Sequence, residues 1–187
     1  MLEFIQDTDW SILHFIRDAL HCGVLDYIMP RLTLLGNGGI IWIIAAVAMV
    51  VSKKYRKHGV ILLLGLLLGL LVGNVALKNI VARERPCWSE SVQLLISNPK
   101  DYSFPSGHTL SSVIAAFVIT SADKRFGFIA VPLASLIAFS RLYLYVHFPS
   151  DVIAAAVLGV LIGWFTVHFL GKGYDRLLLK KHAEAAK

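Results

Sequence analysis

The chain has 187 residues, of which 57% are hydrophobic and only 16% are charged, and its mean hydropathy is +0.69. This composition excludes an ordinary water-soluble domain and favours an integral membrane protein. The formal net charge of +6 requires no nucleic-acid partner, because basic residues in cytoplasmic loops beside anionic lipid explain most of it.

The first predicted element is a helix within the N-terminal stretch DTDWSILHFIRDALHCG. This stretch mixes apolar and charged residues behind a cap-like Asp or Thr, a pattern typical of a helix that lies in the membrane interface. It lacks the basic start and the long apolar core of a cleaved signal peptide. The sequence leaves open whether this helix lies flat or forms a sixth span.

Five membrane spans are expected after it. Uncharged or nearly uncharged runs of about 20 residues, the length that crosses the hydrocarbon layer, predict three of them at 32–51, 59–77 and 152–171. Shorter runs at 109–122 and 126–140 become long enough if their helices begin near Ser106 and continue past Arg141. The fold class is therefore an all-α polytopic membrane bundle of about six helices. It forms one domain over 1–187, with spans near 27–52, 58–80, 106–122, 126–146 and 151–171.

The distribution of basic residues predicts the orientation in the membrane. Most of the 18 Lys and Arg fall in the loop between the first two spans, in the loop between the third and fourth spans, and in the C-terminal tail. We expect that side to be cytoplasmic. The N-terminal helix and the loops near 81–105 and 141–151 are then expected on the outer face of the cytoplasmic membrane.

Three segments on the expected outer side carry ionisable groups at membrane depth, where such groups are costly and usually mark a functional site. The segments are KNIVARERPCW, FPSGH and SRLYLYVHFPSD. Lys78, Arg85 and Arg141 supply cations from different spans. Cations that converge on one pocket favour an anion, and phosphate is the commonest one.

The FPSGH segment predicts a phosphate cradle at a helix start. If the third span begins at Ser106 or Gly107, its first unpaired NH groups and its positive dipole end point into the pocket. Gly107 lets an anion approach the backbone, and the Ser106 hydroxyl adds a donor. His108, in the first turn, is placed to give a proton to a leaving oxygen.

The HFPSD segment predicts a nucleophile with an orienting partner. His147 and Asp151 are four residues apart, which is one helical turn if the chain coils there. A carboxylate bonded to one ring nitrogen leaves the other nitrogen free to attack. The chemistry implied is phosphoryl transfer through a phosphohistidine, with cations and backbone NH groups stabilising charge instead of a metal.

These motifs, taken together and in order, resemble the signature of the type 2 phosphatidic acid phosphatase superfamily. They are Lys78, six residues, then Arg85-Pro86; Pro105-Ser106-Gly107-His108; and Ser140-Arg141, five residues, then His147, three residues, then Asp151. The resemblance implies a phosphatase without metal or cofactor, in which His147 is the nucleophile, Asp151 its partner and His108 the acid. It implies that the phosphate binders are Lys78, Arg85, Ser106, Gly107 and Arg141.

The resemblance also implies a lipid phosphate or diphosphate as substrate. With an outward-facing site, we expect hydrolysis of undecaprenyl diphosphate to undecaprenyl phosphate, which serves cell wall biogenesis. Phosphatidylglycerophosphate and phosphatidic acid are alternative substrates, and a lipid phosphotransferase is an alternative activity. A transporter or scaffold would require the motif residues to be dispensable, and a haloperoxidase with a similar anion cradle should be soluble.

Residues outside the motifs have simpler interpretations. Arg83 and Glu84 are interpreted as a solvated loop pair, with binding of a second phosphate as the alternative role of Arg83. Cys22 and Cys87 both fall on the expected outer side, where a disulfide is permitted but not established. Glycines four residues apart predict close helix packing, with a homodimer face as the alternative; they are Gly65, Gly69, Gly73, Gly159 and Gly163.

Overall fold

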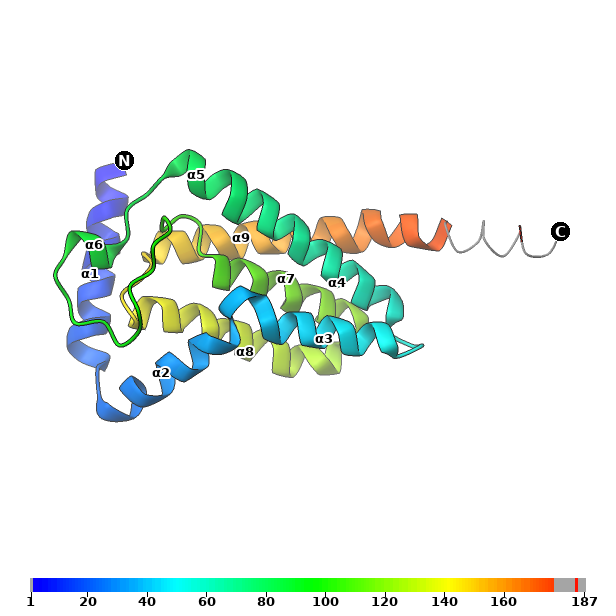
Figure 1. Cartoon of the computed structure of the whole chain (residues 1–187), viewed down its shortest axis with the longest axis horizontal. Helices are drawn as coiled ribbons and strands as arrows, with labels where there is room; N and C mark the ends of the chain where they lie inside the picture. Colours follow the sequence, from blue (N-terminus) through cyan, green and yellow to red (C-terminus); the bar gives the residue numbers. More distant parts are fainter. Residues whose placement is uncertain (1, 177–183, 185–187) are drawn as a thin grey trace.

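The computed structural model describes residues 2–176 and residue 184, and the regular structure in that part of the chain is entirely helical (Figure 1). The all-α prediction is confirmed. Four helical segments there are long and apolar enough to cross a membrane: Gly23–Val51, Arg56–Ser89, Lys124–Tyr143 and Pro149–Arg176. The shorter apolar helix Gly107–Ala122 completes the set of five segments that the sequence predicts.

Each span is built from one or more helices. The first contains α2 (Gly23–Leu35), a short 3-10 turn η1 (Asn37–Gly39) and α3 (Ile40–Val51). The second contains α4 (Arg56–Gly69), the π-helical η2 (Leu70–Leu77), α5 (Lys78–Val81) and α6 (Pro86–Ser89). The remaining helices are α7 (Gly107–Ala122), α8 (Lys124–Tyr143), α9 (Pro149–Phe165) and the π-helical η3 (Thr166–Leu170).

The N-terminal helix α1 (Leu2–Leu20) lies across one end of the bundle, crosswise to the long helices (Figure 1). The loop between α5 and α7 lies at that same end, whereas the turn between α3 and α4 lies at the opposite end. Helix α1 is not among the four segments that are long and apolar enough to span. Its placement favours an interfacial helix over a sixth span.

The first span is broken, although the sequence predicts one span over 27–52. Gly38 and Gly39 have φ angles of 57° and 69°, in the left-handed region that glycine adopts without strain. The break separates α2 from α3 and brings Asn37 next to α7. Hydrophobicity alone predicted the span and could not locate this turn.

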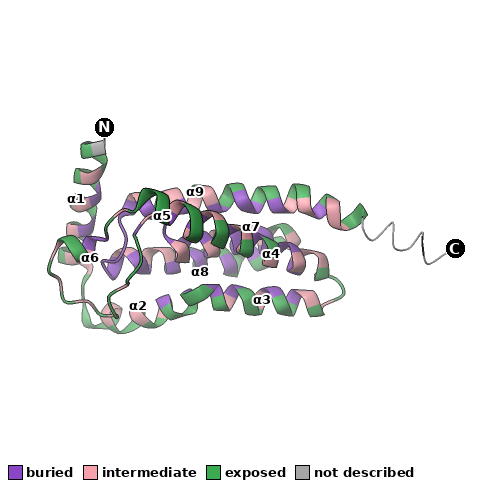
Figure 2. Ribbon diagram, turned by 45° about the horizontal axis from the view of Figure 1, so that its top comes forward, coloured by how far each residue is buried: buried purple, intermediate pink, exposed green. Residues whose placement is uncertain are grey.

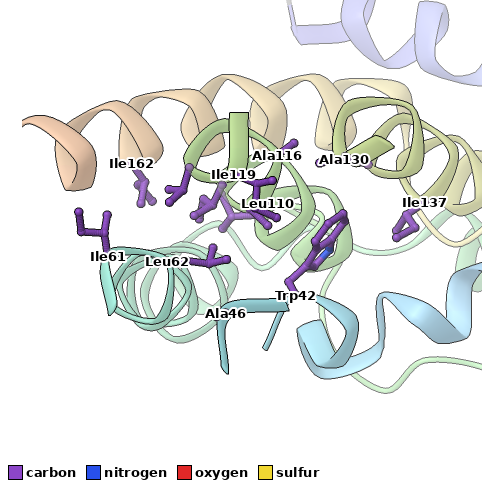
Figure 3. Close-up of a cluster of buried hydrophobic side chains, with 14 of the residues drawn as sticks. Trp42, Ala46, Ile61, Leu62, Leu110, Ala116, Ile119, Ala130, Ile137 and Ile162 are labelled. Carbon is purple, nitrogen blue, oxygen red and sulfur yellow. The ribbon is translucent and has the colours of Figure 1, made fainter. Parts of the chain in front are cut away.

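Helix α7 is the centre of the bundle and contacts α3, α4, α8 and α9. Figure 3 shows the side chains that pack around it, among them Trp42, Leu62 and Ile162. Buried residues face this interior and exposed residues face outward (Figure 2). Large apolar side chains on the outside, such as Phe128 with 82% exposure, suit contact with lipid.

The glycine spacing serves packing inside the bundle. A Cβ on Gly159 would lie 2.8 Å from Cβ of Val113, and one on Gly163 would lie 2.9 Å from Cβ of Phe117. On the second span, Gly65 meets Ile114 in the same way, at 3.0 Å. The packing prediction is confirmed, and these glycine faces are covered by the chain's own helices rather than offered to a second copy.

Candidate active site

The predicted site residues meet at the end of the bundle where α1 lies. A cavity of about 580 Å³ opens there, lined by Lys78, Arg85, Gly107, His108, Arg141 and His147. Ser106 and Asp151 are fully buried behind its wall rather than lining it. The structure therefore brings the three motifs together, with six of the eight predicted residues at the cavity surface.

The start of α7 borders the cavity as predicted. Ser106 is the N-cap, and its Oγ accepts hydrogen bonds from the backbone N of Thr109 at 3.5 Å and from Thr109 Oγ1 at 3.0 Å. A Cβ on Gly107 would lie 2.9 Å from Asn74 Oδ1, so only glycine fits there without displacing that side chain. The backbone of Gly107 faces the cavity, whereas the Ser106 side chain caps the helix. The role of Ser106 in binding phosphate stays a prediction.

Three buried cations surround the cavity from three elements. Lys78 begins α5, Arg85 caps α6 and Arg141 lies in the last turn of α8, and none is more than 6% exposed. Arg141 Nη1 donates to Thr33 Oγ1 at 2.6 Å. Its Nε is the buried side-chain nitrogen without a hydrogen-bond partner in the described part of the chain. Buried polar atoms are normally paired, so this orphan donor fits an anion-binding role.

The neighbours of His147 fix which ring nitrogen is free. Arg85 Nη1 lies 3.1 Å from His147 Nε2, and a guanidinium can only donate, so Nε2 presents its lone pair. The hydrogen of the neutral ring is then on Nδ1, which lies 3.3 Å from Ser103 Oγ. Burial, together with the charges of Arg85 and Arg141, lowers the pKa of His147 well below its ordinary value. The imidazole is therefore neutral, with Nε2 able to act as a nucleophile.

Asp151 reaches His147 through a third residue. Helix α9 begins only at Pro149, so His147 lies outside it and the predicted helical turn from His147 to Asp151 does not form. His147 Nδ1 and Asp151 Oδ2 are 3.7 Å apart, too far for a hydrogen bond. Ser103 stands between them and donates to Asp151 Oδ2 at 2.5 Å. The backbone N of Phe148 donates to the same oxygen at 2.9 Å. Ser103 was not predicted from the sequence, because no spacing rule connects it to His147.

The interpretation of Arg83 as part of a solvated loop pair is wrong. Its Nη1 donates to Asp151 Oδ1 at 2.6 Å and to Ser150 Oγ at 2.7 Å, and its Nη2 donates to Asp9 Oδ2 at 2.7 Å. Arg83 does not line the cavity, which counts against the alternative role in binding a second phosphate. Instead, it ties the buried Asp9 of α1 to the start of α9. The sequence carried no sign of this link, because its members come from three distant segments.

Two further residues at the cavity were missed by sequence reasoning. Asn37 Oδ1 lies 2.8 Å from His108 Nε2 and holds the ring at the cavity edge. Asp101 forms ion pairs with both Lys78 and Arg85. Burial alone would raise the pKa of Asp101, but the hydrogen bond from Lys78 and the charges of Lys78 and Arg85 outweigh it and lower the pKa to about 2. The Asn-Gly-Gly turn inside an apolar run was the only signal for the first of them.

The cavity also has an apolar side, which α2, α3, α4 and the start of η2 form together. Its lining there is Leu34, Ile43, Leu63, Leu66, Leu67 and Leu70. On the second span, Leu63, Leu66, Leu67 and Leu70 precede Lys78 by about two to four helical turns, so they lie away from the cations. This separation suits a molecule with a charged head and an apolar tail. Both Cys22 and Cys87 are free thiols, which decides the open question of a disulfide between them.

The site lies in a part of the chain that matches known proteins. Residues 58–175 match the family model described as the PAP2 superfamily, and that range includes all three motifs. An undecaprenyl-diphosphatase of Sulfolobus acidocaldarius is 33% identical over 135 residues, which are 71% of this chain and 65% of that protein. The matched region thus spans just under two thirds of that relative's length.

Two other proteins match over more of their length. Undecaprenyl-diphosphatase BcrC of Bacillus subtilis is 28% identical over 151 residues, which are 80% of this chain and 77% of that protein. The crystal structure of a transmembrane PAP2 type phosphatidylglycerolphosphate phosphatase from Bacillus subtilis superposes with a TM-score of 0.69. It is 27% identical and covers 92% of this chain and 86% of its own.

Proposed function

The chain belongs to the PAP2 superfamily and is an integral membrane phosphatase, and from this premise we propose that it hydrolyses a lipid phosphate or diphosphate through a phosphohistidine on His147. The observation that carries the proposal is the two-sided cavity. Its polar end offers three cations, an orphan Arg141 Nε and a helix start to a phosphate. Its leucine-lined end offers an apolar surface to a lipid tail.

The proposed first step is attack by His147 Nε2 on phosphorus. A bond forms between nitrogen and phosphorus while the bond to the lipid oxygen breaks, and His108 gives that oxygen a proton. Arg85 Nη1, which lies 3.1 Å from Nε2, must turn from Nε2 to a phosphoryl oxygen as the attack begins. Lys78, Arg141 and the NH of Gly107 stabilise the remaining charge. In the second step, water attacks phosphorus and gives a proton to His108 while the bond between nitrogen and phosphorus breaks, which releases phosphate and neutral His147.

We propose undecaprenyl diphosphate as the substrate and undecaprenyl phosphate as the product. Two relatives named for this activity support the choice. The distribution of basic residues supports a site on the outer face of the cytoplasmic membrane. Phosphatidylglycerophosphate stays an alternative because of the structural neighbour, and phosphatidic acid or transfer to another lipid uses the same chemistry.

The test is phosphate release by the full chain in detergent with EDTA, comparing undecaprenyl diphosphate, phosphatidylglycerophosphate and phosphatidic acid. We expect a preference of about tenfold or more for the diphosphate, which is about 1.4 kcal/mol in transition-state binding. His147→Ala is the blank. Loss of activity in EDTA that magnesium restores would contradict the metal-free mechanism. Equal rates on all three lipids would contradict the substrate assignment.

A further inference from the structure

Asp101 contacts two of the cations that are proposed to bind the substrate's phosphate. Its Oδ2 accepts a hydrogen bond from Lys78 Nζ, and its Oδ1 accepts one from Arg85 Nη2 at 2.9 Å. All three residues line the cavity that also contains Arg141 and His147. A carboxylate therefore bridges two of the three cations assigned to the substrate's phosphate.

The three partners differ in how firmly they are held. The side chains of Lys78 and Arg85 are 8% and 2% exposed, whereas that of Asp101 is 56% exposed. Arg85 Nε also donates to the backbone oxygen of Asp101 at 2.6 Å, which anchors the main chain independently of the carboxylate. The Asp101 side chain can thus rotate toward solvent while its backbone and both cations stay in place.

Phosphate and the Asp101 carboxylate bind these cations through the same kind of interaction. Each is an anion whose oxygens accept charge-assisted hydrogen bonds from Lys and Arg. A phosphate beside an unmoved Asp101 would meet a like charge at close range, which is unfavourable in a partly buried site. Arg141 differs from the other two cations, because its Nε has no partner to give up.

We propose that Asp101 is an affinity-determining residue that competes with the substrate's phosphate for Lys78 and Arg85, and that it turns away when phosphate binds. The inference rests on the proposed function, because it takes these cations as the phosphate site. Competition of this kind weakens binding of substrate and of product phosphate alike. It favours release of inorganic phosphate at the end of each turnover.

The first test measures the dissociation constant of inorganic phosphate for the full chain in detergent by calorimetry, which needs no turnover. We expect Asp101→Asn and Asp101→Ala to bind phosphate about tenfold more tightly than the unchanged protein. The matched control is Glu84→Gln, which removes the same charge from an exposed residue that precedes Arg85 in the chain, and it should change the constant by less than about twofold. Equal or weaker phosphate binding by both Asp101 variants would overturn the proposal.

The second test needs no substitution and so does not depend on folding of a variant. The unchanged protein is labelled with a water-soluble carbodiimide and an amine, with and without tungstate as a phosphate analogue that avoids the reaction of phosphate with the reagent. Labelling of Asp101, read by mass spectrometry, should rise with tungstate, whereas labelling of Glu84 should not. Unchanged or reduced labelling of Asp101 at saturating tungstate would overturn the proposal.

Lipid hydrolysis measured on the same preparations separates this proposal from the proposed function. If the protein hydrolyses a lipid but the Asp101 variants bind phosphate no more tightly than the unchanged protein, only the proposed role of Asp101 is refuted. Tighter phosphate binding by those variants, with hydrolysis of none of the lipids, refutes the lipid phosphatase assignment and leaves the competition at the anion site supported.

Discussion

The apolar core around α7 and the polar site at its N-terminus are held together by different forces. In the core, glycines allow neighbouring helices to approach closely, and apolar side chains fill the space between them. Because lipid is as apolar as the side chains, such packing relies on close van der Waals contact. At the polar end, hydrogen bonds hold buried charged groups in place: Asp151 accepts hydrogen bonds from Ser103, Arg83 and the backbone of Phe148.

This difference separates stability from chemistry. The core is specified by shape, so substitutions there should change how well the chain folds. The polar end is specified by hydrogen-bond direction and charge, so substitutions there should change turnover in a protein that remains folded. Substitutions in the site and in the core test this separation.

The largest effect is expected from His147→Ala. Without Nε2 there is no nucleophile, so turnover should fall by at least about a thousandfold and no phosphoenzyme should form. The measurement is labelled phosphoenzyme after an alkaline quench, together with steady-state phosphate release. His108→Ala is the matched variant, and it should still form phosphoenzyme from a substrate with a good leaving group. Near-normal turnover of His147→Ala would show that the nucleophile is elsewhere.

Arg141→Ala should lower kcat/KM by about a hundredfold, the usual scale for loss of one donor to a developing charge. The reason is that Arg141 lines the cavity and that its buried Nε has no hydrogen-bond partner. Phosphate release kinetics provide the measurement. Arg31→Ala removes an exposed arginine of α2 and should leave kcat/KM unchanged. If both variants behaved alike, the orphan Nε would not be a phosphate donor.

Ser103→Ala should lower kcat by about tenfold, because His147 loses the hydroxyl that orients its Nδ1 and misplacement of a reacting group is costly. KM should change little, since Ser103 does not line the cavity. The control is Ser112→Ala, which removes an equally buried hydroxyl that bonds Trp42 in the core. A rise in KM with unchanged kcat would contradict an orienting role.

Gly159→Val should destabilise the fold by about 1–3 kcal/mol and leave kcat per folded molecule unchanged. Its side chain would meet Cβ of Val113 and the backbone oxygen of Leu110, neither of which can move freely. Thermal unfolding in detergent gives the stability. Gly173→Val is the control, because a Cβ there has no neighbour within 4 Å. A variant at 159 that is stable but inactive would break the separation between core and site.

The pH dependence of turnover tests the protonation state of His147. Protonation of Nε2 removes the nucleophile, so an ordinary histidine would cause kcat/KM to fall about fourfold between pH 8 and pH 6. Because burial and nearby cations depress the pKa of His147, this loss should occur only at lower pH. The profile is measured after separate titration of the substrate phosphate by phosphorus NMR. A fourfold fall attributable to the enzyme would show that His147 is not held neutral.

Much of this protein could be predicted from its sequence. The apolar runs predicted five membrane segments, and the start of the third at Gly107 followed from a cap residue and the length that a span requires. The motif residues could be identified together because each motif is a short stretch of sequence near the end of a helix. Arg83 shows the limit: it stands two residues before Arg85, yet it faces Asp9 and Asp151 instead of the cavity.

The sequence by itself therefore determined the membrane class, the helical segments and the chemical groups of the site. These depend on hydrophobicity and on periodicity along the chain, which act over short distances in sequence. Only the tertiary structure decided that Ser103 stands between His147 and Asp151, that Asn37 meets His108, and that Asp101 pairs with the cations. Those contacts join distant segments through loop conformations, and loop backbones are set by the packing of the whole bundle rather than by local pattern.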